Sequence, residues 1–168
     1  MRLLFTPSSR GAAAVNLLDI DQLTWVHHTG DDSGGPTIDY WGTILDIRDP
    51  GHIELLYRWE PMSHCHFHRH RAHTTSIILE GELHVADYVD GKATESRVRP
   101  AGHRAHGGGD EVHREWGGPA GALVYFSIYT EDGILVEQLN EQGEILRTVT
   151  LEDLKKTYRK QLAKSQEA

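Results

Sequence analysis

The sequence lacks the features that mark disulfide-rich, membrane-spanning and nucleic-acid-binding proteins. It contains one cysteine, Cys65, so no internal disulfide can form, and a reducing, cytoplasmic location is expected. No apolar run approaches the roughly 18 to 20 residues of a membrane-spanning helix. A formal net charge of -8 argues against nucleic acid or an anionic membrane surface as the main partner. We therefore expect a soluble, single-domain protein that acts on small molecules.

The serine-hydrolase class is also disfavoured, because the chain has no Gly-x-Ser-x-Gly motif. What the chain does have is a series of short segments rich in β-branched and aromatic residues. We expect strands at 40–47, 52–59, 74–79, 83–88, 96–99, 122–130, 133–139 and 144–149. Turn residues separate them, as in Asp49-Pro50-Gly51, Glu80-Gly81 and Asp90-Gly91. This spacing predicts an all-β sandwich or barrel.

Other segments complete the expected organisation. Residues 30–36 are predicted to be a loop, and residues 107–121 a long glycine-rich connection that forms a lid or a site wall. Thr150 and Asp153 resemble a capping box before an amphipathic helix at 151–163. We divide the chain into a lead-in at 1–19, which faintly resembles a transit peptide, a barrel at 20–150, and a helix with its tail at 151–168.

A row of histidines is the most informative stretch. Four of them occupy alternate positions in His64-Cys65-His66-Phe67-His68-Arg69-His70. Alternate side chains share one face of a strand, so this spacing predicts a strand with an inward row of imidazoles. Neutral imidazole binds zinc, copper, nickel and ferrous iron, and the row is therefore expected to be half of a metal site. Cys65 would face the opposite way as a buried thiol.

The row is expected to divide into two pairs. His68 and His70 are nearest the following strand and are predicted to be metal ligands. His64 and His66 lie upstream and would form a supporting layer or carry protons. The remaining ligand must come from a strand distant in sequence.

Three stretches together resemble the two motifs of the cupin superfamily. They are His68-Arg69-His70, the segment 77–83 around Glu80-Gly81, and Pro100-Ala101-Gly102 with His106. Residues 58–70, Tyr88 and the closing pattern over 132–154 further resemble the 2,4′-dihydroxyacetophenone dioxygenase-like cupins, a branch that includes acetylacetone-cleaving and ChrR-like proteins. The resemblance covers roughly residues 20 to 160.

The resemblance implies a jelly-roll barrel, or double-stranded β-helix, that is commonly a homodimer and holds ferrous iron through three histidines. Many cupins add a glutamate four residues after the second histidine, where this chain has Thr74. The family's third histidine usually falls at the position of Ala105. We expect His106 to be the third ligand here, with His103 as the alternative.

This resemblance leads to a functional hypothesis. Ferrous iron held by His68, His70 and His106 would bind a hydroxyketone or diketone together with dioxygen, insert both oxygen atoms and cleave a carbon-carbon bond to give carboxylic products. His64 or His66 would deprotonate the substrate. Strand residues that could line the pocket are Tyr57, Trp59, Glu82, His84, Tyr88, Tyr125 and Tyr129.

Other functions fit the same ligands. A cupin with zinc, nickel or manganese would catalyse hydrolysis, isomerisation or elimination, and oxygen dependence would separate it from a dioxygenase. A ChrR-like zinc sensor would bind metal without catalysis, although such a sensor is expected to carry a separate partner-binding domain. A metal-free barrel is the simplest alternative.

Overall fold

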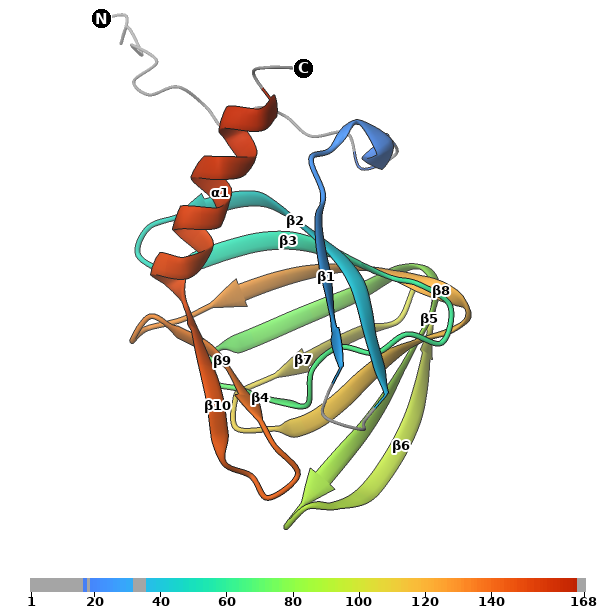
Figure 1. The fold of residues 1–168 in the computed structure, drawn as a ribbon. Coiled ribbons are helices and arrows are strands. Elements are labelled where there is room, and N and C mark those ends of the chain that lie inside the picture. Colours follow the sequence, from blue (N-terminus) through green and yellow to red (C-terminus); the bar gives the residue numbers. More distant parts are fainter. Residues whose placement is uncertain (1–16, 18, 32–35, 166–168) are drawn as a thin grey trace, which may run out of the picture.

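The computed structural model describes residues 17, 19–31 and 36–165, and within them the chain forms ten strands and two helices (Figure 1). Most of the predicted lead-in at 1–19 and of the predicted loop at 30–36 lies outside the described residues. The strands are β1 (Val26–Asp31), β2 (Thr37–Arg48), β3 (His52–Trp59), β4 (His68–His70), β5 (His73–Val89), β6 (Lys92–Pro100), β7 (Arg104–Gly107), β8 (Val112–Tyr129), β9 (Ile134–Leu139) and β10 (Ile145–Thr150). A 3-10 helix, η1, spans Ile20–Gln22, and α1 spans Leu151–Ser165.

The strands form one antiparallel sheet that curls around the core (Figure 1). Its main path runs β1-β2-β3-β8-β4-β9-β10, while β5 pairs with β6, β7 and β8. The two longest strands, β5 and β8, therefore pair with each other and with two further strands each: β5 with β6 and β7, and β8 with β3 and β4. This confirms an all-β jelly-roll barrel with a C-terminal helix.

Alternation along the strands creates the core. In β3, Ile53 and Leu55 are buried while their neighbour Glu54 is only partly buried, and in β8 Val124 and Phe126 follow the same pattern. Side chains two apart share a face, so each strand gives one face to the interior. The same alternation decides which polar side chains can reach the interior.

Two predictions about the long strands are wrong. Glu80-Gly81 is a bend inside β5 rather than a hairpin turn, and residues 112–121 belong to β8 rather than to a loop. Gly81 and Gly121 both have positive φ, at 66° and 77°, and a Cβ on Gly81 would lie 2.2 Å from the Gly121 carbonyl oxygen. The glycines thus allow two paired strands to bend and approach closely without ending. The predicted Asp90-Gly91 hairpin, between β5 and β6, is confirmed.

Helix α1 begins at the predicted capping box. Thr150 N–H and Oγ donate to Asp153 Oδ2 at 3.1 and 2.8 Å, and Asp153 N–H donates back to Thr150 Oγ at 3.3 Å. Further along the helix, the buried Gln161 amide accepts from Ile44 N–H and donates to Thr43 Oγ and the Ile44 carbonyl. These bonds fix α1 against β2. No helix among the described residues is long and apolar enough to cross a membrane.

Candidate metal centre

Two neighbouring strands bring four potential metal ligands together. His68 and His70 lie on β4, and His113 and Glu115 lie on β8, with His68 paired directly opposite His113. Each pair is separated by one residue, so the strand period places both members on the same face. One ligand atom from each of the four residues lies within 4.8 Å of the others.

The three imidazoles, hereafter the buried triad (His68, His70 and His113), converge through the same nitrogen. His68 Nε2 lies 3.1 Å from His70 Nε2 and 3.0 Å from His113 Nε2. Metal-nitrogen bonds of about 2.1 Å would place neighbouring ligands about 3.0 Å apart at right angles and about 3.4 Å apart in a tetrahedron. The two distances fit ligands of a single ion, and three histidines would leave further coordination positions for other groups.

Hydrogen bonds on the far side of two rings fix their tautomers. His68 Nδ1 lies 2.7 Å from the His66 carbonyl oxygen, which can only accept, so Nδ1 carries the proton. His70 Nδ1 lies 3.2 Å from Thr74 Oγ, whose own proton is donated to the Ala72 carbonyl at 3.1 Å. In the neutral form with its proton on Nδ1, each of these two rings presents an unprotonated Nε2 to the other. Thr74, at the position where many cupins carry glutamate, thus orients a ligand.

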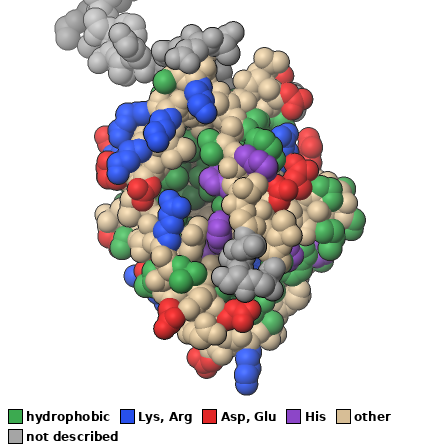
Figure 2. All heavy atoms as spheres, in the orientation of Figure 1, with side chains coloured by type: hydrophobic (Ala, Val, Ile, Leu, Met, Phe, Trp, Pro, Cys, Tyr) green, Lys and Arg blue, Asp and Glu red, His purple; other side chains and the backbone are tan. Residues whose placement is uncertain are grey.

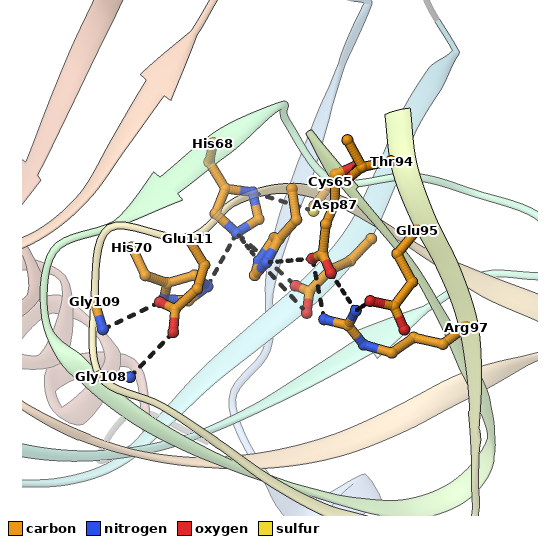
Figure 3. A network of polar contacts seen from close by, with 12 residues as sticks. Cys65, His68, His70, Asp87, Thr94, Glu95, Arg97, Gly108, Gly109 and Glu111 are labelled. Carbon is orange, nitrogen blue, oxygen red and sulfur yellow. Dashed lines mark hydrogen bonds and ion pairs between the residues drawn. The ribbon is translucent and has the colours of Figure 1, made fainter. Parts of the chain in front are cut away.

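The third ring is supported by a carboxylate. His113 Nδ1 lies 4.0 Å from Asp87 Oδ1, on the neighbouring strand β5. Arg97 in turn forms a two-pronged ion pair with Asp87, and Glu95 lies on its other side (Figure 3). At 4.0 Å the carboxylate is too far away to accept a hydrogen bond from the ring, but its negative charge favours a proton on the nearer nitrogen, Nδ1.

Burial favours the neutral form of two of these rings. His68, His70 and His113 are 7, 9 and 8% exposed. Burial and the neighbouring rings lower the pKa of His70 well below its ordinary value, and burial followed by His68 does the same to the pKa of His113. Unprotonated nitrogens about 3 Å apart repel unless a cation lies between them. The residues present therefore fit a divalent metal ion.

Glu115 borders the triad. It is 4% exposed, and its carboxylate oxygens lie 3.9 Å from His68 Nε2 and 3.8 Å from His113 Nε2. These distances are longer than those between the histidine nitrogens, but they still allow the carboxylate to be a fourth ligand of the same ion. In this position the carboxylate can accept a proton or a hydrogen bond from a molecule bound at the centre.

The structure places His106 and His103 away from the triad, so we replace His106 by His113 in the ligand set. His106 lies on β7 with an exposed side chain, and its Nδ1 is 3.0 Å from Thr75 Oγ. Along β7, Ala105 pairs with the buried Ser76 and His106 pairs with Thr75, so alternation gives the interior face to Ala105, and His106 contributes only to the wall of a cavity beside the triad. His103 is exposed in the turn before β7.

His113 and Glu115 were missed because the glycines after them suggested a loop. A signal was present in the sequence, since His113-Arg114-Glu115 has the same one-residue spacing as His68-Arg69-His70. Two such pairs on hydrogen-bonded neighbouring strands can lie side by side on the same interior face.

The upstream half of the histidine row is not a strand. Only residues 68–70 are extended in β4, and the chain before them forms a turn and irregular backbone. As a result, the His64 ring stacks on Trp116, with centroids 5.2 Å apart. His66 instead meets Tyr40 edge-on, at 6.4 Å, and lines a cavity beside the triad.

The direction predicted for Cys65 is wrong, although its burial is confirmed. The thiol is 6% exposed, lines the same cavity as His68, and lies 3.7 Å from His68 Nδ1. Irregular backbone between Cys65 and His68 breaks the expected alternation. Burial raises the pKa of the Cys65 thiol well above its ordinary value, which disfavours a thiolate nucleophile.

An apolar cavity of about 90 Å³ lies on one side of the triad. Its walls include the predicted pocket residues Tyr57 and Trp59, together with Phe126 and Ile128 from β8. Burial raises the pKa of Tyr57 to about 12, so its phenol remains a hydrogen-bond donor at neutral pH.

The other five predicted pocket residues line neither this cavity nor the polar cavity described below. Tyr125 and Tyr129 alternate with Phe126 and Ile128 along β8 and so face the other side of the sheet. His84 Nε2 lies 2.9 Å from Glu82 Oε1, and its ring packs on Trp116. Tyr88 packs edge-on against Phe67, at 4.9 Å.

A second cavity adjoins the apolar cavity on the side of helix α1. A neighbouring cavity of about 150 Å³ shares Tyr40, Tyr57, His66, Gln138 and Val149 with it and extends to α1. Figure 2 shows a hollow on this face, with apolar side chains inside it and histidines at its edge. The two cavities together provide a path from the surface to the triad.

A third cavity, of about 100 Å³, also borders the triad and is hereafter called the polar cavity, because charged side chains lie in its walls. His70, Glu115 and Phe126 line both this polar cavity and the apolar one. Arg97 and Arg99 from β6 contribute to its walls. The candidate centre thus borders an apolar space and a space that contains cationic side chains.

No protein-family model matches the chain, and no curated protein matches it. Solved structures, in contrast, are similar over almost the whole chain. An acetylacetone dioxygenase from Acinetobacter johnsonii is 11% identical, with a TM-score of 0.65, over 96% of this chain and 99% of its own. A protein of Methylibium petroleiphilum PM1 proposed to be an acetylacetone dioxygenase is 14% identical, with a TM-score of 0.66, over 92% and 99%.

An RmlC-like cupin from Ralstonia eutropha JMP134 aligns with a TM-score of 0.61 at 12% identity, over 84% of this chain and 89% of its own. The chain has a cupin fold. At such identities the likeness concerns the fold alone, and the candidate ligands come from this chain's own geometry. The buried triad and Glu115 form a group that could hold a metal ion.

Proposed function

We propose that this cupin is a non-haem ferrous dioxygenase that cleaves a carbon-carbon bond in a small diketone or hydroxyketone. The observation that carries the proposal is the convergence of three buried imidazoles beside an apolar cavity, with His68 Nε2 lying 3.1 Å from His70 Nε2 and 3.0 Å from His113 Nε2. The fold likeness to an acetylacetone dioxygenase supports the same reaction class.

His68, His70 and His113 would hold the ion, and Thr74 and Asp87 would orient the rings of His70 and His113. Ferrous iron, when bound there, would supply a Lewis acid and electrons for the reaction with dioxygen. Because three histidines leave further coordination positions, substrate and dioxygen would approach the ion at those positions.

The apolar cavity would hold the carbon skeleton of the substrate. Trp59 and Phe126 give it apolar walls and exclude water from the reacting carbons. The Tyr57 phenol, protonated at neutral pH, would donate a hydrogen bond to a substrate oxygen. Such a site favours a compact, mostly apolar substrate with a few oxygen atoms.

Glu115 would act as the base. Its buried carboxylate lies beside His68 and His113 and lines both cavities at the centre. It would accept the proton from the carbon next to the ketone, and so give the enolate that reacts with dioxygen. This role replaces the one predicted for His64 or His66, of which His66 lines the apolar cavity.

Metal analysis combined with oxygen uptake tests the proposal. Protein purified without oxygen should carry about one iron per chain. It should consume one dioxygen per molecule of acetylacetone or 2,4′-dihydroxyacetophenone cleaved, and a His113→Ala variant should do neither. Full iron loading without oxygen uptake on any small diketone or hydroxyketone would rule out the dioxygenase.

A non-oxidative metalloenzyme is the second candidate, and Glu115 favours it specifically. A buried carboxylate beside a metal ion can serve hydrolysis, isomerisation or elimination as a base without dioxygen. Zinc-, nickel- or manganese-loaded protein that turns over ketone substrates at an equal rate without oxygen would support this reading over the first.

A further inference from the structure

The polar cavity contains more charge than the proposed reaction uses. It lies against the triad through His70 and His113, and the buried Ser76, 5% exposed, also lines it. A diketone needs no cationic wall, because it is neutral or is held as an enolate by the metal. The charges of this cavity therefore require a separate account.

Most of these charges are matched by neighbours within the protein. Arg97 pairs with Asp87 and with the more exposed Glu95 (Figure 3). Glu111 accepts hydrogen bonds from Gly108 N–H and Gly109 N–H, both at 3.1 Å, and so closes the loop between β7 and β8. These two groups have structural roles.

Arg99 differs from them. Its Nε is buried and has no hydrogen-bond partner among the described residues. Burial lowers the pKa of Arg99, and the nearby Glu115 partly opposes this shift. Leaving a buried guanidinium N–H without an acceptor is costly, so such a group usually has a partner that arrives from outside.

We propose that the polar cavity binds a carboxylate through Arg99, so that the natural substrate is a small ketone that carries a carboxylate. The Arg99 guanidinium and the Ser76 hydroxyl donate to the carboxylate. The ketone oxygens then lie at the triad, and the apolar remainder of the molecule lies beside Phe126. This inference rests on the proposed metal centre, because it places the ketone there.

The same guanidinium could instead hold a carboxylic acid formed by the reaction. The chemistry recognised is a carboxylate in both cases, and the two sources differ in whether the carboxylate and the ketone belong to one molecule. A carboxylate-bearing diketone should bind more tightly than either its ester or a simple acid. If the cavity serves only product release, acetate should bind as well as the diketone acid.

Binding measurements without oxygen separate these cases. Calorimetric titration of zinc-loaded protein would use 2,4-dioxopentanoate, its methyl ester and acetate. In the wild type we expect the acid to bind at least about tenfold more tightly than the ester, since charge-assisted hydrogen bonds are worth that much. Arg99→Gln should remove this preference and leave the affinity for the ester within about twofold.

Arg104→Gln is the matched control, because it removes the same charge from an exposed position on β7. It should bind all three compounds as the wild type does. Arg99→Lys, which keeps the charge but not the planar fork, should retain part of the preference. It also replaces Arg99→Gln if circular dichroism shows that the latter does not fold.

Equal affinity of the wild type for the acid and the ester would overturn the inference, as would an Arg99→Gln variant that keeps the preference. Acetate binding as tight as that of 2,4-dioxopentanoate would assign the cavity to product instead. The proposed dioxygenase activity is tested separately. A protein that binds the acid more tightly than the ester but never consumes oxygen would support the carboxylate site and rule out the dioxygenase activity.

Discussion

Two groups of three histidines in this protein differ in almost everything except residue type. The buried triad converges at about 3 Å on the interior face of β4 and β8. The other three, hereafter the exposed group, lie at the surface around β5 and β7 and are His73, His103 and His106. Within the exposed group, the rings of His73 and His106 stack with centroids 6.2 Å apart.

The difference lies in what stands behind each ring. Two buried rings donate Nδ1–H to a carbonyl or hydroxyl oxygen, and the third faces a carboxylate, so that Nε2 remains free to bind a cation. In the exposed group, His106 uses Nδ1 to contact a surface threonine, and solvent can reach the ring. The number of histidines near a motif therefore does not show which of them can bind a metal ion until the direction of each side chain is known.

Removal of one buried ring is expected to have the largest effect. His68→Ala should lower affinity for ferrous iron or zinc by more than about 100-fold, because His68 Nε2 is the atom closest to both other nitrogens. The check is competition with a chelator of known affinity. His73→Ala, in the exposed group, is the control and should bind metal as the wild type does.

A variant of Glu115 should separate chemistry from metal binding. Glu115→Gln keeps the size of the side chain but removes the base, so we expect turnover to fall about 100-fold while one metal ion per chain remains. Steady-state kinetics and metal analysis of the same sample measure both quantities. A fall in metal content in parallel with turnover would instead make Glu115 a ligand.

Substitution of Asp87 tests whether its carboxylate helps His113 to bind metal, and the expected effect is smaller. Asp87→Asn should weaken metal affinity about tenfold, because the carboxylate favours the correct tautomer of His113. Glu95→Gln is the matched control, since Glu95 contacts Arg97 but lies 69% exposed on the outside of the same ion-pair group. Chelator competition on both variants should show the loss only for Asp87→Asn.

The stability of the metal-free protein should depend on pH through the buried triad. Burial lowers the pKa of His70 and His113, so near and below pH 6.5 the unfolded chain binds more protons than the folded chain. The contribution of these two rings to the free energy of unfolding is therefore fully present above pH 6.5. It is lost as the pH falls toward the lowered pKa values, by up to about 1.4 kcal/mol per pH unit for each ring.

Urea unfolding of metal-free protein between pH 7.5 and 5 measures this slope. The His113→Gln variant should show a shallower loss than the wild type, because one of the two rings no longer titrates. Equal slopes for the two proteins would contradict the role given to burial.

The sequence predicted the barrel and the helix, and it pointed to two of the four residues in the candidate metal group, for physical reasons that can be named. Strand alternation and turn residues are local signals, and the strands were confirmed where the chain is regular; the His68-Arg69-His70 pair is a local signal of the same kind. The candidate group differs from the predicted one where long strands bend at glycine, because in the sequence Gly81 and Gly121 look like the glycines of turns and loops. Which of His106 and His113 faces inward depends on pairing between distant strands.

The direct test of the central claim compares His113→Ala with His106→Ala by metal analysis after loading with one equivalent of ferrous iron and gel filtration under nitrogen. We expect His106→Ala to retain about one iron per chain and His113→Ala to retain almost none, with both variants folded by circular dichroism. Iron retained by His113→Ala and lost from His106→Ala would contradict the buried triad.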